Sequence, residues 1–465
     1  MLMLSVRNPS HVGFALTLAT IAAVLAAWAP VARGDWSVPQ VVGSAPPLHL
    51  GRGSVSALGG RVAVDSRGDV AVAWSRTGER PTKWQGRRCS WGPGKPSPTR
   101  LGCYPVTTVH LTVKMASGKM VTRTVTSAPG VELIGLVLRP AEATALLEYL
   151  KPGMNSPGGV RAAYGPLTGR WSAARTIGGS WSIGYTNGFP WAQPHLALAP
   201  DGTVLVAWNG CLSQHACGGV IGGGGGYAEQ QVVVACHSPG RPFGAATVVR
   251  AAPLGAVPQF DAAGTAYLSS SCSGTVAIAP AHSRRFRATI VTKGATQSFT
   301  LALSGAGQGL GTWVAGACSY NQASGNQGGA VLVSILRAGG FVTPFALTSA
   351  PAEWADAVAS PIGVSVSWYD GTSFMVQVDA NGVPGTVQDG PTALPLGVDG
   401  GGDVLFAPVV QLGFGDFVRP AGGGADQPGP APWGQGTWAL SAAGRVVAVL
   451  WYPDMTKLDL STWRP

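Results

Sequence analysis

GTVLVAW, residues 202–208, is a glycine followed by a strand-like run that ends in tryptophan. In a strand, the two valines and Trp208 fall on one face, while Leu205 and Ala207 fall on the other. Both faces are apolar, so we expect neighbouring elements to bury this strand on two sides. The preceding residues 200–202 (PDG) predict a tight turn that leads into it.

The pattern of residues 202–208 recurs along the chain. GDVAVAW (68–74) and GQGLGTW (307–313) keep the spacing from glycine to tryptophan. Self-similarity at intervals of tens of residues predicts a repeat architecture. We expect each tryptophan to pack in the core of its own repeat and to mark the end of a buried strand. Looser copies lie at 363–368 and 444–451, and 264–270 keeps the spacing without the ring.

Each repeat is predicted to contain four antiparallel strands. In residues 194–250, a second strand ends at Trp208, a third follows at 231–236 and a fourth lies near 245–249. An aromatic residue, here Phe243, precedes the fourth strand. Applied along the chain, the template gives eight units, near 57–127, 130–177, 194–250, 257–292, 298–347, 354–388, 392–420 and 437–460.

Serial four-stranded sheets that bury one another predict an all-β fold, a β-propeller of about eight blades. The unit at 392–420 is short, so seven blades is the alternative. Residues 141–150 predict either a strand or a short helix. Residues 35–37 (DWS) resemble residues 170–172 (RWS), which precede a predicted fourth strand. We therefore expect the N-terminal strand to complete the last blade and close the ring. Residues 35–465 would then form a single domain.

Two of the predicted turns, 64–68 (VDSRG) and 198–202 (LAPDG), resemble the turn half of Asp-box repeats. On these turns the chain resembles secreted bacterial β-propeller repeat proteins and is sialidase-like at the level of the fold. Its tryptophans lie further from the turn glycine than in the Asp-box pattern. The resemblance implies a rigid scaffold with its ligand site on loops, or, as the alternative, a carbohydrate-active hydrolase.

The first 34 residues predict a signal peptide. Arg7 precedes an apolar stretch at 12–29, and residues 32–34 (ARG) offer small side chains to a signal peptidase. The apolar stretch is long enough to span a bilayer, so an uncleaved membrane anchor is the alternative. No later stretch is apolar for that length. We therefore expect a secreted or extracellular protein.

An oxidising compartment would pair most of the seven cysteines. The spacing of the cysteines suggests three pairs and leaves Cys236 unpaired. The sequence has no C-x-x-C motif and no Cys/His cluster, so no metal site is expected, and no motif indicates a cofactor. The predicted pairs are Cys89 with Cys103, Cys211 with Cys217, and Cys272 with Cys318.

The composition indicates a globular, basic protein. Hydrophobic residues make up 46% of the chain and charged residues only 11%, which excludes a disordered chain. The formal net charge of +10 favours acidic partners. We expect a glycan, an anionic envelope polymer or a protein as partner, and the sequence has no specific nucleic-acid motif.

The direction of the strands assigns every connection to one of two faces. Turns between strands one and two, and between three and four, lie on one face, the turn-bearing face. Connections after strands two and four lie on the opposite, loop-bearing face. Long loops on a rigid scaffold commonly carry binding groups, so we expect the ligand there. The long segments all belong to the loop-bearing face: 76–105, 178–193, 209–228, 315–327 and 420–436.

Two of these segments hold the ligand-binding candidates. The insertion at 76–105 interleaves arginines with tryptophans. Guanidinium groups bind phosphate, sulfate or carboxylate, and indoles stack on sugars. Segment 178–193 adds aromatic rings among glycines, which suits sugar rings, although packing of all these rings on the propeller rim is the alternative. The candidates are Arg76, Trp84, Arg87, Arg88, Trp91, Trp181, Tyr185 and Trp191.

Carboxylates are scarce, 21 in the chain, and several occupy predicted turns. Asp370 follows the strand that ends at Trp368, on the loop-bearing face, and Glu353 and Asp356 enter the same repeat. Two carboxylates across a cleft are the requirement for glycoside hydrolysis, so these three are the catalytic candidates. A protein whose loops bind nothing is a third possibility. The aspartates assigned to turn structure are Asp65, Asp201 and Asp261.

Overall fold

A computed structural model gives the fold. None of the residues that it describes lies in a helix with the length and apolarity that a membrane span requires. Residues 1–34 fall outside the described part, so the signal peptide stays a prediction. The described residues are 35–44, 48–50, 53–55, 58–78, 82–84, 87–89, 106–150, 157–183, 194–212, 230–305, 307–316, 318, 328–337, 340–360, 363–389, 393–398, 404–408, 417–419, 427–428, 436–440, 447–451 and 457–464.

The fold is all-β, as predicted, and the described residues form eight antiparallel sheets of four or five strands. We number them I to VIII along the chain. Sheet I contains β5 (Leu58–Val64), β6 (Val70–Gly78), β9 (Val106–Lys114) and β10 (Met120–Pro129). Sheet II contains β11 (Val131–Arg139), β12 (Glu142–Leu150), β13 (Pro157–Pro166) and β14 (Arg175–Thr176). Sheet III contains β16 (His195–Leu198), β17 (Val204–Cys211), β18 (Gln231–His237) and β19 (Thr247–Val248), with β15 (Ser182–Ile183) beside β17.

Sheets IV to VI follow the same plan. Sheet IV contains β20 (Val257–Phe260), β21 (Ala266–Ser269), β22 (Thr275–Ala279) and β23 (Arg287–Ile290). Sheet V contains β24 (Thr296–Gly305), β25 (Gln308–Ala315) and β26 (Val331–Arg337), with β27 (Gly340–Phe341) and β28 (Phe345–Ala346) beside β26. Sheet VI contains β29 (Trp354–Ser360), β30 (Gly363–Tyr369), β31 (Ser373–Asp379) and β32 (Gln388–Asp389).

The last two sheets include both ends of the described chain. Sheet VII contains β33 (Ala393–Val398), β34 (Val404–Pro408), β35 (Phe417–Arg419) and β36 (Gln427–Pro428). Sheet VIII contains β37 (Gly436–Leu440), β38 (Val447–Trp451), β39 (Lys457–Arg464) and β1 (Asp35–Trp36), with β2 (Gln40–Ser44) beside β39. Two further pairs are β3 (Leu48–Leu50) with β4 (Gly53–Val55), and β7 (Thr82–Trp84) with β8 (Arg87–Cys89).

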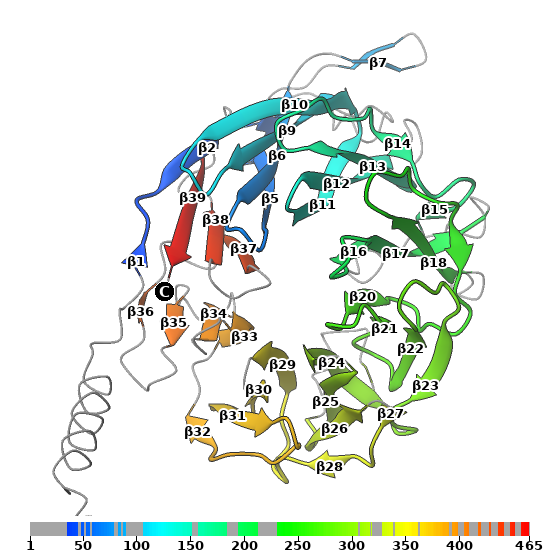
Figure 1. Cartoon of the computed structure of the whole chain (residues 1–465), viewed down its shortest axis with the longest axis vertical. Helices are drawn as coiled ribbons and strands as arrows, with labels where there is room; N and C mark the ends of the chain where they lie inside the picture. The colour runs from blue at the N-terminus through cyan, green and yellow to red at the C-terminus, as the bar shows by residue number, and fades with distance from the viewer. Residues whose placement is uncertain are drawn as a thin grey trace, which may run out of the picture.

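The sheets follow one another around a common centre, with the first strand of each nearest to it (Figure 1). The N-terminal strand β1 pairs with the C-terminal strand β39, in the register Asp35 to Arg464 and Trp36 to Trp463. The hydroxyl of Ser461 adds a hydrogen bond of 3.0 Å to the Ser37 carbonyl. The number of blades in the complete ring and its closure stay predictions.

Strand β17 shows why the sheets stack. All eight of its residues are buried. Trp208 packs with Leu146 of sheet II, whereas Leu205 packs with Leu268 of sheet IV. A strand that is apolar on both faces is therefore buried on both faces, as predicted. The other tryptophans of the repeat whose side chains are described, Trp74, Trp313 and Trp368, are buried as well.

The structure settles whether residues 141–150 form a strand or a helix, extends one predicted unit and finds strands in segments predicted to be irregular. Residues 141–150 form no helix: β12 pairs with both β11 and β13, because its two apolar faces are covered by sheets I and III. The unit predicted at 392–420 is a four-stranded sheet that extends to Pro428. The segments 76–105, 178–193 and 420–436 are not wholly irregular, since they contain the β7–β8 hairpin, β15 and β36 respectively.

Candidate functional site

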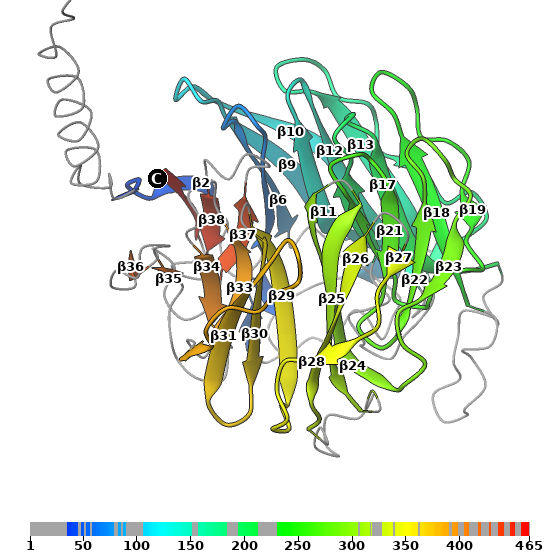
Figure 2. The ribbon, with the colours of Figure 1, turned by 60° about the horizontal axis from the view of Figure 1, so that its bottom comes forward.

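A pocket of about 370 Å³ lies at the loop-bearing end of the junction between sheets V and VI. The first strands of these sheets, β24 and β29, lie side by side (Figures 1 and 2). Both strands start at the loop-bearing face, so the pocket is on the face where the sequence predicts a ligand. We call it the V–VI pocket. Its lining residues are Ser271, Ser298, Phe299, Thr300, Trp354, Ala355 and Asp356.

An irregularity at the start of β24 shapes one wall of the V–VI pocket. The pairing of β24 with β25 shifts register between Gln297 and Thr300. Ser298 within this bulge has φ of 54°, in the left-handed region that side chains other than glycine rarely adopt. The Phe299 N–H donates to the Ser271 carbonyl at 2.8 Å and so joins the bulge to sheet IV. Backbone strain of this kind is concentrated at functional sites.

Asp356 is the ionisable group of the V–VI pocket. Burial raises the pKa of its carboxyl, and hydrogen bonds from the Ala357 N–H and the Thr300 side chain oppose that shift. The Ala357 N–H lies 2.8 Å from Oδ1 of Asp356. A half-buried carboxyl with a raised pKa accepts hydrogen bonds from a ligand when ionised and donates a proton when neutral.

An aromatic platform flanks Asp356. Trp354 and Tyr369 are opposite each other on β29 and β30, and their ring centroids are 6.1 Å apart with planes only 10° from parallel. Both residues are half-buried, in contrast to the buried tryptophans of the repeat. Trp354 and Asp356 are two residues apart in one strand and therefore share a face. The arrangement combines a flat apolar surface with a polar group.

The structure separates the three catalytic candidates. Asp356 alone among them lines the V–VI pocket. Glu353 is exposed, and its backbone N–H donates to the Tyr369 carbonyl at 2.7 Å. Asp370 stabilises the turn after β30, where Oδ1 accepts a hydrogen bond of 3.3 Å from the Thr372 N–H. Within the described residues, no pair of carboxylates lines this pocket.

The predicted ligand-binding residues are described in part. Arg76 is exposed at the end of β6, and its charge adds to burial in lowering the pKa of His110. Trp181 is half-buried and packs against the core between sheets II and III. Trp84 lies in β7, and Arg87 and Arg88 lie in β8; their side chains are outside the described part. Outside the described residues altogether are Trp91, Tyr185 and Trp191.

The cysteines agree with the prediction where they are described. Cys272 and Cys318 form a disulfide, which joins the loop after β21 to the loop after β25 next to the V–VI pocket. Cys236 is free. Cys211 is disulfide-bonded, but its predicted partner Cys217 lies outside the described residues. The pairing of Cys89 with Cys103 also falls outside them and stays a prediction.

Sequence reasoning missed the Trp354–Tyr369 platform. Neither residue follows the glycine-to-tryptophan spacing, so neither was a candidate. The alternation of Trp354 and Asp356 at the start of a predicted first strand was the available signal. Among the residues that the structure describes, no group of three histidine, cysteine or acidic side chains is arranged to hold a metal ion.

No family model matches this chain, and no curated protein matches it in sequence. Solved structures match over most of its length at low identity. A streptogramin B lyase is 6% identical, with 92% of this chain and 98% of that chain covered and a TM-score of 0.40. A virginiamycin B lyase from Staphylococcus aureus is 10% identical (80% and 96% covered, TM-score 0.35), and a Hadza microbial sialidase is 11% identical (77% and 73% covered, TM-score 0.36). These neighbours are β-propeller proteins, and the likeness concerns the fold alone.

Proposed function

We propose that this protein is a secreted or cell-surface β-propeller that binds a glycan in the V–VI pocket. The observation that carries the proposal is the half-buried Trp354–Tyr369 stack next to the desolvated carboxyl of Asp356. The basic residues of the loop at 76–105 favour an anionic glycan or envelope polymer as the ligand. The disulfide between Cys272 and Cys318 agrees with an oxidising compartment.

A sugar ring fits the chemistry of the V–VI pocket. Its C–H face is apolar and its rim consists of hydroxyl groups. Trp354 supplies a flat apolar surface for the C–H face. Hydrogen-bonding groups for the hydroxyl rim come from the carboxyl of Asp356 and the hydroxyls of Ser298 and Thr300. A pocket of about 370 Å³ has the volume of an ordinary small-molecule site.

Trp354→Ala is expected to weaken glycan binding about tenfold or more, because the sugar loses its stacking surface. The measurement is binding of the purified protein to an array of immobilised glycans, followed by calorimetric titration with the glycan that gives the strongest signal. Phe345→Ala is the matched control, since Phe345 is a half-buried aromatic residue in β28 that does not line the V–VI pocket. Equal affinity of Trp354→Ala and wild type would refute this site, and an array without signal would favour a protein ligand.

The alternative function is a carbohydrate-active hydrolase with its acidic site near Asp370. One observation favours it: a carboxyl with a raised pKa, such as that of Asp356, suits a general acid. The lack of a second carboxylate in the described lining of the V–VI pocket opposes it.

Asp356→Asn separates the binding protein from the hydrolase. For a binding protein, we expect the wild type to leave the array glycan uncleaved and Asp356→Asn to retain binding within about tenfold. For a hydrolase, the wild type would release new reducing ends, and Asp356→Asn or Asp370→Asn would abolish the release. Because burial disfavours the charged form of Asp356, its contribution to stability falls as pH rises above its unfolded pKa. The neutral asparagine is therefore expected to fold normally at neutral pH.

A further inference from the structure

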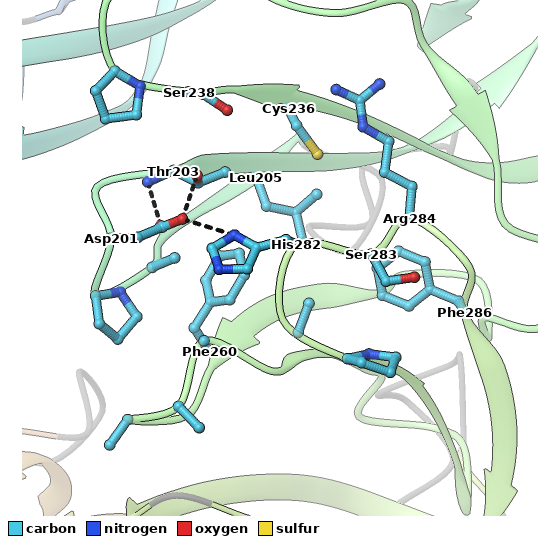
Figure 3. Close-up of a pocket in the computed structure, with 18 residues that line it drawn as sticks. Asp201, Thr203, Leu205, Cys236, Ser238, Phe260, His282, Ser283, Arg284 and Phe286 are labelled. Atoms are coloured by element: carbon cyan, nitrogen blue, oxygen red, sulfur yellow. Dashed lines mark hydrogen bonds and ion pairs between the residues drawn. The ribbon is translucent and has the colours of Figure 1, made fainter.

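The turn-bearing face contains a second pocket, of about 330 Å³, between sheets III and IV. Figure 3 shows the side chains that line it. We infer that this pocket, the III–IV pocket, is a binding site for a small amphiphilic carboxylate. It lies on the face opposite the V–VI pocket, so the inference is independent of the proposed glycan binding.

Tight turns of two adjacent sheets form the mouth of the III–IV pocket. Residues 199–203 and 238–239 come from sheet III, and residues 262–264 and 280–284 come from sheet IV. The interior is apolar, because Leu205, Phe260, Ala266 and Phe286 line it. Leu205 is 2% exposed, so the interior reaches the packed layer between the two sheets. Such a surface suits an alkyl chain or another apolar body.

Charge at the mouth of the III–IV pocket favours an anion. Its acidic residue, Asp201, is already engaged: Oδ2 lies 3.3 Å from Nδ1 of His282 and 3.0 Å from the Thr203 hydroxyl. Arg284 is exposed, and within the described residues no carboxylate forms an ion pair with it. A guanidinium above an apolar interior is the complement of a carboxylate attached to an apolar body.

The backbone at the mouth is held in an uncommon conformation. The Ser283 N–H donates to the Pro280 carbonyl at 2.9 Å and closes a turn in which His282 has φ of 59°. Glycine is the usual residue at such a position, because other side chains are strained there. Here the left-handed residue directs an imidazole toward Asp201 (Figure 3). Strained residues of this kind cluster at ligand sites, and the other one described, Ser298, lines the V–VI pocket.

Cys236 provides a reporter inside the III–IV pocket. It lines the pocket and is free. Burial raises the pKa of its thiol, and the positive charge of Arg284 opposes that rise. Arg284 and Cys236 line the same pocket. A carboxylate bound to Arg284 with its apolar body in the interior would therefore cover Cys236.

Protection of Cys236 from alkylation tests the inference on the full chain. The thiol is labelled with N-ethylmaleimide under native conditions, and peptide mass spectrometry measures the labelling at Cys236 itself. Sodium octanoate is expected to slow this labelling several-fold and saturably, whereas octylamine and octanol, which lack the carboxylate, are not. Arg284→Gln is expected to abolish the protection, and Arg285→Gln, at the neighbouring exposed arginine, is expected to retain it.

Three results would overturn the III–IV pocket as a carboxylate site: no protection by octanoate, equal protection by octanol or octylamine, or protection that survives Arg284→Gln. Calorimetric titration of octanoate into wild type and Arg284→Gln gives the same comparison without the thiol, and equal heats in both would also overturn it. Glycan binding by Arg284→Gln is expected to equal that of the wild type, so the two sites are tested separately.

Discussion

Asp261→Ala is expected to lower the free energy of unfolding by about 3–5 kcal/mol. Asp261 is 2% exposed and its carboxylate accepts four hydrogen bonds. Oδ1 accepts from the backbone N–H groups of Ala263 and Thr265, at 2.9 and 2.8 Å. Oδ2 accepts from the Tyr267 hydroxyl at 3.1 Å and from the Gly307 N–H at 2.8 Å, which links sheet IV to the first turn of sheet V. Alanine leaves these donors without their acceptor.

Denaturant unfolding of Asp261→Ala and wild type measures this loss. Asp201→Ala is the matched control, because Asp201 occupies the equivalent turn of sheet III but its side chain is 40% exposed. Its carboxylate accepts hydrogen bonds from the N–H and the hydroxyl of Thr203, and its contact with sheet IV is an exposed one, at 3.3 Å from Nδ1 of His282, so we expect a loss of only about 1 kcal/mol there. A loss for Asp261→Ala no larger than for Asp201→Ala would contradict the inter-sheet role.

Trp208→Ala is expected to cost about 3–5 kcal/mol of unfolding free energy. The ring is 1% exposed, and it fills the layer between sheets II and III together with Leu146, Val160 and Ala162. Alanine at this position leaves a cavity that the stacked sheets cannot close without moving toward each other and disturbing their packing. The tryptophan that defines the repeat is therefore a stability determinant.

Thermal or denaturant unfolding of Trp208→Ala next to Trp354→Ala distinguishes the two classes of tryptophan. Trp354 is half-buried at a pocket, so its truncation is expected to cost less stability than that of Trp208 while it weakens glycan binding. A mild effect of Trp208→Ala would show that the glycine-to-tryptophan repeat does not form the core.

Local periodicity explains what the sequence could predict. Alternation with period two and a glycine turn are properties of a few consecutive residues, and they sufficed for β17, for its two buried faces and for most of the four-stranded units. Successive strand ends also placed Cys272 and Cys318 close enough to pair. The segment now seen as β12 was ambiguous because a short apolar run without a glycine turn suits a helix as well as a strand.

The sites depend on contacts that no local pattern contains. The V–VI pocket combines Ser271, Ser298 and Asp356 from three sheets, and its shape depends on a register shift inside β24. The sequence did not predict the III–IV pocket for another reason. Long loops are the usual sign of a binding site, whereas short turns form the mouth of this pocket. The residue that indicates this pocket is His282, which occupies a turn position where glycine is usual. The left-handed backbone conformation of His282 is visible only in the structure.

A crystal structure of the protein with the strongest glycan of the array tests the central claim most directly. We expect electron density for a sugar ring parallel to the indole of Trp354, with a ring hydroxyl within hydrogen-bond distance of the Asp356 carboxyl. Density for the glycan elsewhere, with the V–VI pocket holding only solvent, would contradict the claim.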